Sequence, residues 1–341
     1  MRKKERGIAL LLALLVLTIL IVLIAQMSVT TLNTKTISEN YLNDLQNSYG
    51  NRSGYYQALL YLEADMEKEP NIDSLAEKWT TAISFSLGKS AIAVTIEDSE
   101  RRINLSRINN DDEDKTLNED IAEQFRQLLF VLGHPSDISD RIIDYIDTDT
   151  KGDYENEARN DRLYTLEELL QIEGVPSESL YGGRLAGTEV EGFLDYVTIY
   201  PRTLEEGETA GLININTASS AVFQSLSEDI TPELAAEIDA YRNAMGADNT
   251  PQVFEKKEDI QNVSGMSSEI YEEISSHIDV KATHFEIRVK SSHRNLTKNW
   301  LYVVKKKQEG EGEEATHELT LVFSQKLTDF LAVPPPEEEE N

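Results

Sequence analysis

The sequence predicts an α+β fold in which a long N-terminal helix carries an antiparallel sheet, and an all-α insertion interrupts the sheet. Three observations indicate this fold. An apolar run near the N-terminus passes directly into a helical pattern, strand patterns occur only before residue 108 and after residue 283, and the block between them repeats itself. The 341 residues are enough for two or three modest domains.

The charge of the chain is distributed unevenly. The formal net charge is -30, and residues 108–283 alone hold 39 acidic and 12 basic residues. Such a block repels phosphate backbones, because nucleic-acid binding depends on cations that neutralise phosphates, but it suits divalent cations, which prefer oxygen ligands. Since the chain has no cysteine, disulfides, thiolate nucleophiles and Cys-based zinc or iron–sulfur sites are excluded.

The N-terminus has the pattern of a membrane anchor. The first seven residues form a short, basic leader. An apolar run follows over residues 8–25, in which Thr18 is the only polar residue. At 1.5 Å per residue the run spans about 27 Å, close to the hydrocarbon core of a bilayer. The basic leader predicts a cytoplasmic N-terminus, with the bulk of the chain across the membrane. A secretory signal peptide and an ordinary uncleaved anchor are the alternatives, but no small-x-small cleavage site follows the run.

The helix is expected to continue beyond the membrane. From residue 27 to about residue 67, apolar residues recur at three- and four-residue steps, until Pro70 ends the pattern. Gly50 and Gly54 weaken the middle of this helix by about 1 kcal/mol each relative to alanine. A plain membrane stalk is the alternative. Strand patterns follow over residues 90–105, with a turn at Asp98-Ser99, and return at residues 285–289, 300–304 and 319–323.

The block between the strands contains an internal repeat. Residues 168–175 match residues 259–266 at an offset of 91, and Ile143-Asp144 matches Ile238-Asp239 at an offset of 95. Each unit therefore reads as helix, tight turn, helix, loop and short helix ending at glycine, with units at about residues 117–175 and 212–266. Chance similarity between helical segments is the alternative. Asn216 or Thr217 can cap the first helix of the second unit.

The opening of the second unit, Asn214-Ile215-Asn216-Thr217-Ala218, resembles the start of helix-hairpin-helix domains. The same opening occurs in K pseudopilins and in membrane-anchored DNA receptors of competence systems. A DNA-binding hairpin offers bare backbone N–H groups and nearby cations to a phosphate. Here the turn, residues 227–232, has two carboxylates, a proline and no glycine, so it should repel phosphate. We therefore expect a packing scaffold, and a DNA receptor is the rival interpretation.

The leader resembles a type IV prepilin signal, because Gly7 stands directly between the basic residues and the apolar run. The resemblance implies that a prepilin peptidase cleaves between Gly7 and Ile8, with methylation of the new N-terminus. The ammonium of Ile8 would then be an unpaired cation in lipid, which is costly. In the family, a Glu at the fifth mature position of a neighbouring subunit offsets this charge. Here that position is Leu12, so this subunit cannot provide a carboxylate to the ammonium of a subunit ahead of it.

Taken together, the leader, the long helix, Leu12, residues 102–105, both helical units and residues 285–289 resemble the minor pseudopilin K family of type II secretion systems. The resemblance implies a pilin-like fold. The expected parts are a leader (1–7), the long helix (8–67), the first part of a pilin-like α+β domain (68–107), the acidic insertion (108–283), the remaining strands (284–331) and a disordered tail (332–341).

The resemblance also implies a function. A K subunit caps the tip of the secretion pseudopilus and helps to initiate its assembly for export of folded periplasmic proteins. The implied partners are smaller minor pseudopilins of the I and J types, the prepilin peptidase, the inner-membrane secretion platform and the outer-membrane secretin. The implied location is the bacterial inner membrane, with a single pass and a periplasmic bulk. A tip subunit of a type IV pilus is a further alternative.

A loop in the first unit, residues 144–157, is a candidate calcium site, because hard cations need several oxygen ligands and Gly152 permits a sharp turn. Its spacing is not that of an EF-hand, and an ordinary solvated acidic loop is the alternative. The Asp-Tyr-Ile-Asp-x-Asp stretch resembles the Asp-Trp-Ile-Asp-x-Asp stretch of K pseudopilins, which carry calcium in their insertion. The candidate ligands are Asp147, Asp149, Asp153, Glu155 and Glu157.

An enzyme is the third class considered. Asp147-x-Asp149 could be a glycosyltransferase metal motif, but nothing suggests a nucleotide-sugar fold. The five histidines show no metal-ligand spacing, and the sequence has no phosphate-cradling Gly-rich loop and no nucleophile elbow. We therefore expect no catalytic residues.

Overall fold

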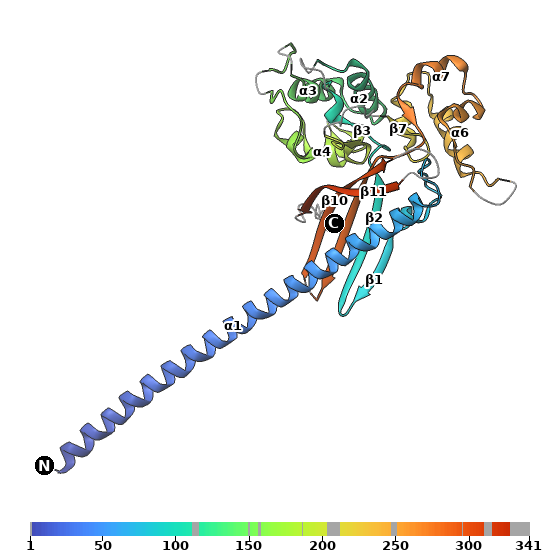
Figure 1. The fold of residues 1–341 in the computed structure, drawn as a ribbon. Helices are drawn as coiled ribbons and strands as arrows, with labels where there is room; N and C mark the ends of the chain where they lie inside the picture. Colours follow the sequence, from blue (N-terminus) through green and yellow to red (C-terminus); the bar gives the residue numbers. More distant parts are fainter. Residues whose placement is uncertain are drawn as a thin grey trace, which may run out of the picture.

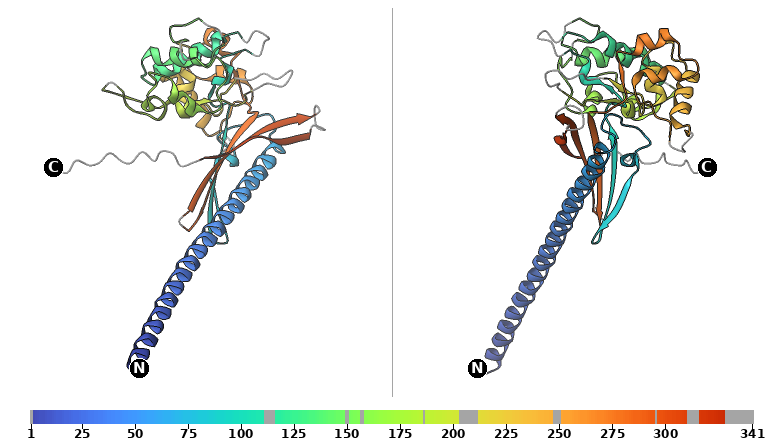
Figure 2. Two further views of the ribbon diagram at one scale, coloured as in Figure 1. Left: turned by 90° about the vertical axis from the view of Figure 1, so that its left-hand side faces the viewer. Right: turned by 45° about the vertical axis from the view of Figure 1, so that its right-hand side comes forward.

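The computed structural model describes residues 2–110, 116–148, 151–155, 158–185, 187–202, 212–246, 251–294, 296–309 and 316–327. One long helix, α1 (Arg2–Met66), carries a folded head at its C-terminal end (Figures 1 and 2). Its 65 residues make it roughly 100 Å long at 1.5 Å per residue. The helix predicted from residue 8 is therefore present, and it begins before the predicted cleavage point.

The head contains a five-stranded antiparallel sheet in the order β1-β2-β9-β10-β11. Its strands are β1 (Ile83–Leu87), β2 (Ser90–Asp98), β9 (His284–His293), β10 (Leu296–Glu309) and β11 (Thr316–Leu327). Strand β2 pairs directly with β9, so the sheet is split by the insertion as predicted. Alternate residues of β2 are buried, and this explains the two-residue alternation from which the strand was predicted. The edge strand β1 is only partly buried and was not predicted.

The last part of α1 packs on one face of this sheet, against β2, β9 and β10. A Cβ atom at Gly54 would lie 2.5 Å from Val289 Cγ1, and one at Gly50 would lie 2.4 Å from Ser291 Oγ. The two glycines therefore let the helix approach the strands closely, and this packing outweighs their low helix propensity. The apolar cluster between helix and sheet includes Leu62, Trp79, Ile92, Val94, Phe285, Ile287 and Val289. The 3-10 helix η1 (Lys78–Thr80) holds Trp79 in this cluster.

The insertion lies beyond the end of the sheet furthest from the N-terminus (Figure 1). Its first unit consists of β3 (Ile103–Asn104), η2 (Leu105–Arg107), α2 (Glu119–Val131), α3 (Ser136–Ile146), η4 (Leu166–Gln171), α4 (Ser177–Tyr181), β4 (Gly183–Leu185), β5 (Thr188–Val190), η5 (Phe193–Tyr196) and β6 (Val197–Thr198). Its second unit consists of β7 (Ile213–Asn214), α5 (Ser220–Gln224), α6 (Pro232–Asn243), η6 (Lys257–Asn262), α7 (Ser268–Ile274) and β8 (Ile278–Asp279). The insertion is thus mainly helical, but it also holds short strands that an all-α description omits.

The internal repeat is visible in the structure. Helices η4 and η6 begin 91 residues apart, as do α4 and α7. Each unit also opens with an Ile-Asn strand that pairs in parallel with a closing strand, β3 with β6 and β7 with β8. Strands β3, β6 and β8 lie outside the limits of 117–175 and 212–266 that the repeat predicted. Strand β3 precedes the predicted border at residue 108, but it pairs with β6 and is not part of the five-stranded sheet.

The core of the insertion forms a second apolar cluster, which runs through both units and reaches the sheet. It includes Phe125, Phe193, Phe223 and Phe254, all of which are buried, together with Val303 of β10. The next residue of β10, Val304, belongs instead to the cluster under α1. The sheet therefore has α1 on one face, while the other face contacts the insertion near Val303.

Candidate functional site

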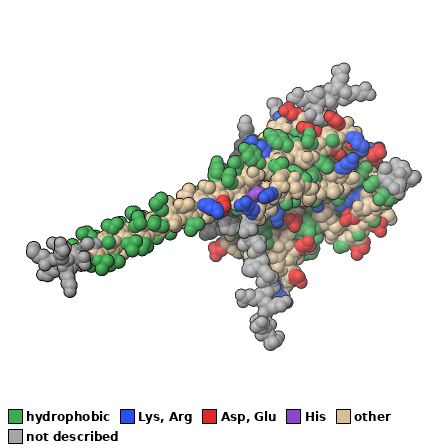
Figure 3. Space-filling model, turned by 90° about the horizontal axis from the view of Figure 1, so that it is seen from below, with side chains coloured by type: hydrophobic (Ala, Val, Ile, Leu, Met, Phe, Trp, Pro, Cys, Tyr) green, Lys and Arg blue, Asp and Glu red, His purple; other side chains and the backbone are tan. Residues whose placement is uncertain are grey.

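The N-terminal part of α1 is long and apolar enough to cross a membrane, and its apolar window is not buried in the protein. Figure 3 shows apolar side chains covering this part of the helix. The predicted cleavage point between Gly7 and Ile8 lies within continuous helix. Ile8 and Leu12 are 60% and 57% exposed, so Leu12 is not buried against the described residues of the head. Both side chains are therefore accessible on the surface of the helix.

The acidic loop of the first unit brings together two buried carboxylates. Asp147 is 2% exposed at the end of α3, where its backbone N–H donates to the carbonyl of Ile143. Asp144 lies one turn earlier on the same helical face and accepts a hydrogen bond of 3.0 Å from the backbone N–H of Tyr154. A Cβ atom at Gly152 would lie 2.2 Å from Asp144 Oδ2. The loop therefore folds closely over Asp144, and a larger residue at position 152 would displace the Asp144 side chain.

Two of the four remaining predicted ligands lie within the described residues. Asp153 is exposed and Glu155 is partly buried, while Asp149 and Glu157 lie outside the described residues. Asp144 was not among the predicted ligands, although its three-residue spacing from Asp147 indicates that the two side chains share one face of a helix. Carboxylate oxygens such as those of Asp144 and Asp147 are the ligands that a hard cation prefers, and a close turn covers Asp144. Calcium binding by this loop stays a prediction.

Three backbone donors in the hairpin turn of the second unit are already used within the turn. The N–H of Asp229 donates to Ser227 Oγ, the N–H of Ile230 donates to the Ser227 carbonyl, and the N–H of Thr231 donates to the Asp229 carbonyl. Thr231 caps α6, whose first residue is Pro232. A phosphate would therefore meet occupied N–H groups and two exposed acids, Glu228 and Asp229. This geometry disfavours DNA binding in the manner of a helix-hairpin-helix domain.

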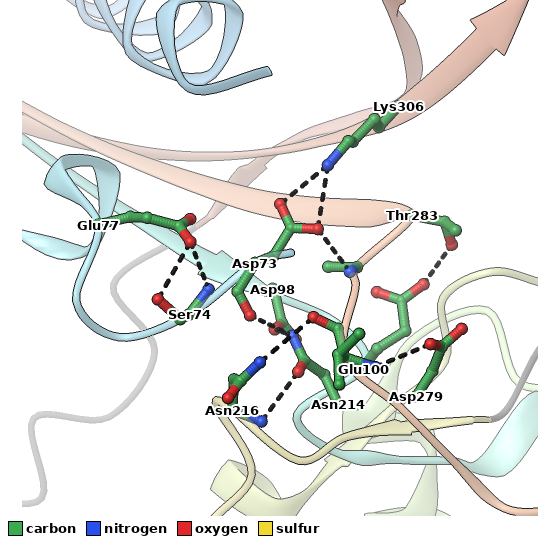
Figure 4. A network of polar contacts seen from close by, with 12 residues as sticks. Asp73, Ser74, Glu77, Asp98, Glu100, Asn214, Asn216, Asp279, Thr283 and Lys306 are labelled. Carbon is green, nitrogen blue, oxygen red and sulfur yellow. Dashed lines mark hydrogen bonds and ion pairs between the residues drawn. The ribbon is translucent and has the colours of Figure 1, made fainter. Parts of the chain in front are cut away.

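The Asn-x-Asn-Thr opening is buried and forms a joint between the insertion and the sheet (Figure 4). Asn214 Nδ2 donates to Asp98 Oδ2 and to the carbonyl of Asp73, each at 2.9 Å. Thr217 Oγ1 donates to the same oxygen of Asp98, and the N–H of Asn214 donates to the Glu100 carbonyl. Because Asp98 ends β2, this network fastens the second unit to the sheet.

The neighbouring Asn216 serves the second unit itself. Its side-chain amide bonds to both the N–H and the carbonyl of Phe254, at 2.9 and 3.0 Å. The prediction that Asn216 or Thr217 caps the next helix was wrong, because Ser219 is the N-cap of α5. The polar residues of the opening are thus used for internal bonds, as expected of a packing scaffold.

A cluster of acids adjoins this joint. Among the described residues, Asp65, Asp73 and Glu77 are the group of three metal-ligating side chains whose ligand atoms all lie within 4.8 Å. Lys306 Nζ already lies 3.0 Å from both carboxylate oxygens of Asp73. Burial, followed by the charge of Asp65, raises the pKa of Glu77 to about 9, so this acid is protonated at neutral pH. The cluster is therefore a buried ion pair beside a neutral acid, and it supports the joint.

The joint should make stability depend on pH. Burial, followed by the negative charge of Glu100, raises the pKa of Asp98 to about 7, whereas an Asp in an unfolded chain titrates near about 4. Because the folded state binds this proton more tightly, the free energy of unfolding should fall as pH rises from about 4 to about 7. Asp98→Asn can still accept hydrogen bonds from Asn214 and Thr217, but it cannot titrate, so its free energy of unfolding should fall less over this pH range.

Urea unfolding at several pH values measures this difference between the variant and the wild type. If the free energy of unfolding depended on pH equally in both, the raised pKa of Asp98 would be contradicted.

Two comparisons with known proteins bear on the fold. A family model of the helix-hairpin-helix motif matches residues 208–279, which correspond to the second unit. A chain from the crystal structure of the GspK–GspI–GspJ complex of the enterotoxigenic Escherichia coli type 2 secretion system superposes with a TM-score of 0.61 and 16% sequence identity. The match covers 85% of this chain and 99% of that chain. No curated protein matches the sequence.

At 16% identity the likeness concerns the fold. The predicted α+β class is confirmed, because the long N-terminal helix, the antiparallel sheet and the helical insertion with its hairpin motif are all present. The chain has the pseudopilin fold.

Proposed function

We propose that this chain is a minor pseudopilin of the K type, which caps the tip of a type II secretion pseudopilus and helps to initiate its assembly for export of folded periplasmic proteins. One observation carries the proposal. The fold matches a chain of the GspK–GspI–GspJ complex over 99% of that chain and 85% of this one, a coverage that requires most of the insertion to take part. In this role the protein acts as a structural subunit and not as an enzyme.

Leu12 supports a place at the tip. After cleavage at Gly7, the ammonium of Ile8 would need a counter-charge in lipid, and a chain below could provide it. Leu12 offers no carboxylate to a chain above, and its side chain stands exposed on α1. The head also extends beyond the end of α1, where it would obstruct a further subunit (Figure 2).

The proposed partners follow from the same arrangement. The related complex contains GspI and GspJ, so we expect smaller I- and J-type pseudopilins to pack along α1. Outside the membrane run, Tyr49, Tyr56 and Leu60 of α1 are each more than half exposed and can contribute to such packing. The prepilin peptidase and the inner-membrane platform would act on the chain at the membrane. The periplasmic head would face secreted substrates or the outer-membrane secretin.

The mature N-terminus tests this proposal. We expect protein purified from membranes to begin at Ile8, and a Gly7→Leu variant to keep its leader and begin at Met1. Edman sequencing or mass spectrometry of the intact chain distinguishes the two. The wild-type protein should also co-purify with two smaller pilin-like proteins. A wild-type chain that begins at Met1, or that binds DNA tightly at physiological salt, would favour an ordinary anchor or a DNA receptor instead.

We also propose that calcium binds the acidic loop of the first unit. The proposal is supported by the buried carboxylates of Asp144 and Asp147 and by the fit of Gly152 over Asp144. The ion would neutralise carboxylates that otherwise repel one another, and would stiffen the loop through Asp149, Asp153, Glu155 or Glu157.

Thermal unfolding with calcium and with a chelator measures this effect. At a calcium concentration about 100 times the dissociation constant, binding should add about 2.7 kcal/mol to the free energy of unfolding and raise Tm by several degrees. Asp147→Asn should remove most of the shift, while Asp195→Asn, at an exposed acid outside the loop, should keep it. Equal shifts in both variants would contradict the proposed ligands.

A further inference from the structure

A pocket of about 470 Å³ lies between the first unit of the insertion and the face of the sheet opposite α1. On the side of the insertion its wall is formed by η4, α4, η5 and β6, and on the side of the sheet by β9, β10 and β11. Figure 1 shows the first unit, with α4, next to β10 and β11. The volume lies within the range of about 300–1,000 Å³ that is usual for ligand pockets.

Apolar and aromatic side chains form much of the pocket wall and remain partly exposed. Tyr164 is 61% exposed although its side chain lines the pocket. Leucines from η4, η5, β10 and β11 also line the pocket and are only partly buried, namely Leu166, Leu194, Leu301 and Leu327. The pocket therefore offers apolar surface, on both the insertion and the sheet, that an apolar group could remove from water.

The buried charges of the pocket already have partners within the protein. Glu286 accepts hydrogen bonds from Arg102 Nη1 at 3.0 Å and from Arg288 Nη2 at 3.2 Å. The other two acids of the lining, Glu167 and Asp195, are exposed to solvent. Since no buried charge of the lining requires a counter-ion, the uncovered apolar surface indicates what kind of group fits, and that group is apolar.

The chain itself supplies an apolar segment next to this pocket. Strand β11 ends at Leu327, whose side chain lines the pocket, and residues 328–341 lie outside the described part of the chain. The residues that follow are Thr328-Asp329-Phe330-Leu331-Ala332-Val333, so four consecutive apolar residues begin three positions after the pocket wall. Three residues span at most about 11 Å, so the chain keeps Phe330 close to the pocket. A tether this short gives an effective concentration in the mM range, which favours the chain's own segment over a separate partner.

We propose that residues 328–331 turn back from β11 and place Phe330 and Leu331 in this pocket. Phe330 is the main anchor, because an aromatic side chain buries about 150–250 Å². The segment connects the first unit of the insertion to the sheet, as Asn214 and Asp98 connect the second unit. Each unit then has its own attachment to the sheet. The proposal goes beyond the proposed function, because it concerns a single chain and does not depend on a place in a filament.

Disulfide trapping in the full chain in detergent tests this proposal, because the chain has no native cysteine. Ala332→Cys places a thiol directly after the docked residues, and Glu167→Cys places its partner at an exposed residue of the pocket wall. The control partner is Ser324→Cys, which is exposed on the face of β11 opposite Gln325 and Leu327. An undocked segment would reach Ser324 at least as easily, because fewer residues separate the two thiols. In the docked chain the Glu167→Cys pair should oxidise at least about ten times faster, as measured by mass spectrometry of unreduced peptides.

A third substitution tests the anchor. Adding Phe330→Ser to the Glu167→Cys/Ala332→Cys chain should slow oxidation severalfold, because the ring that holds the segment is lost. Val333→Ser, at an apolar residue beyond the docked ones, should preserve the rate. Hydrogen exchange of the cysteine-free chain gives a second measurement. Phe330→Ser should raise exchange severalfold at residues 164–168 of the pocket wall and leave β7 and β8 unchanged, which shows that the second unit stays folded.

Three outcomes would overturn the proposal. Equal oxidation of the two cysteine pairs would mean that the segment is not held in the pocket. Equal slowing by Phe330→Ser and Val333→Ser would mean that Phe330 is not an anchor. Disulfides between two chains, instead of within one, would mean that a second copy occupies the pocket. None of these substitutions lies near the leader, so every variant should still begin at Ile8, and a failure here leaves the proposed function unaffected.

Discussion

Replacing Gly54 by leucine is expected to destabilise the head by about 3 kcal/mol, because the new side chain has no space between α1 and the sheet. Its Cβ atom alone would lie 2.5 Å from Val289 Cγ1 and 3.1 Å from methyl groups of Ile92 and Val94. These neighbours belong to the buried cluster under the helix, so none can move without disturbing the strands. The expected sign is opposite to that of helix propensity, which favours leucine over glycine.

Urea unfolding of the full chain in detergent, followed by tryptophan fluorescence, measures this loss. Trp79 is a suitable reporter, because it is 2% exposed and packs edge-on against Phe285 within the same cluster. Glu63→Leu is the matched control, since it introduces the same side chain at an exposed position of the same helix. Gly54→Ala should already be destabilising. If Gly54→Leu were as stable as the control, the close approach of helix and sheet would be wrong.

Features that depend on local pattern could be predicted from the sequence. The apolar run of α1 and the alternation of β2 both have a period that the residues reveal directly. The repeat was visible because both units use the same short helix followed by glycine, so that Gly174 and Gly265 stand 91 residues apart, each with positive φ. Only a glycine adopts that backbone angle readily, which explains why a glycine stands at this position in both units.

Features that depend on distant partners could not be predicted in this way. Strand β3 has two residues, too few for a period, and its partner β6 follows more than ninety residues later. Asp98 looked like a turn residue, while its partner Asn214 lies 116 residues along the chain. The contribution of Lys306 to the acid cluster depends likewise on β10 returning to the joint. Such pairings are decided by the packing of the sheet against the insertion, and no local preference reports them.

Gly50 and Gly54 show how a local preference can mislead. By propensity they weaken a helix, and they were interpreted as a weak point of α1. In the structure they are the residues at which the helix comes closest to β2 and β9. The candidate calcium loop shows the reverse case, because Asp144 and Asp147 share a face by helical spacing alone, and only Asp147 was selected.

The joint between insertion and sheet gives the second large expected effect. Asn214→Ala should destabilise the protein by about 3 kcal/mol, because it removes donors from two buried acceptors, Asp98 Oδ2 and the Asp73 carbonyl. It also removes the acceptor for the backbone N–H of Asn216. Hydrogen exchange should rise at β7 and β8 and at the end of β2, since these segments meet at the joint. Asn243→Ala, at an exposed asparagine of α6, should change stability by less than about 0.5 kcal/mol.

A double-mutant cycle distinguishes the joint from general damage to the second unit. Once Asp98 is alanine, the acceptor that Asn214 serves is gone, so Asp98→Ala/Asn214→Ala should cost less than the sum of the two single losses. The coupling should be at least about 1 kcal/mol, because the two side chains are in direct contact and buried. Additive losses would mean that Asn214 stabilises its own unit only. In that case the Asn-x-Asn-Thr opening would not connect the insertion to the sheet. The orientation of the insertion relative to the sheet would then depend on the apolar contacts of β10.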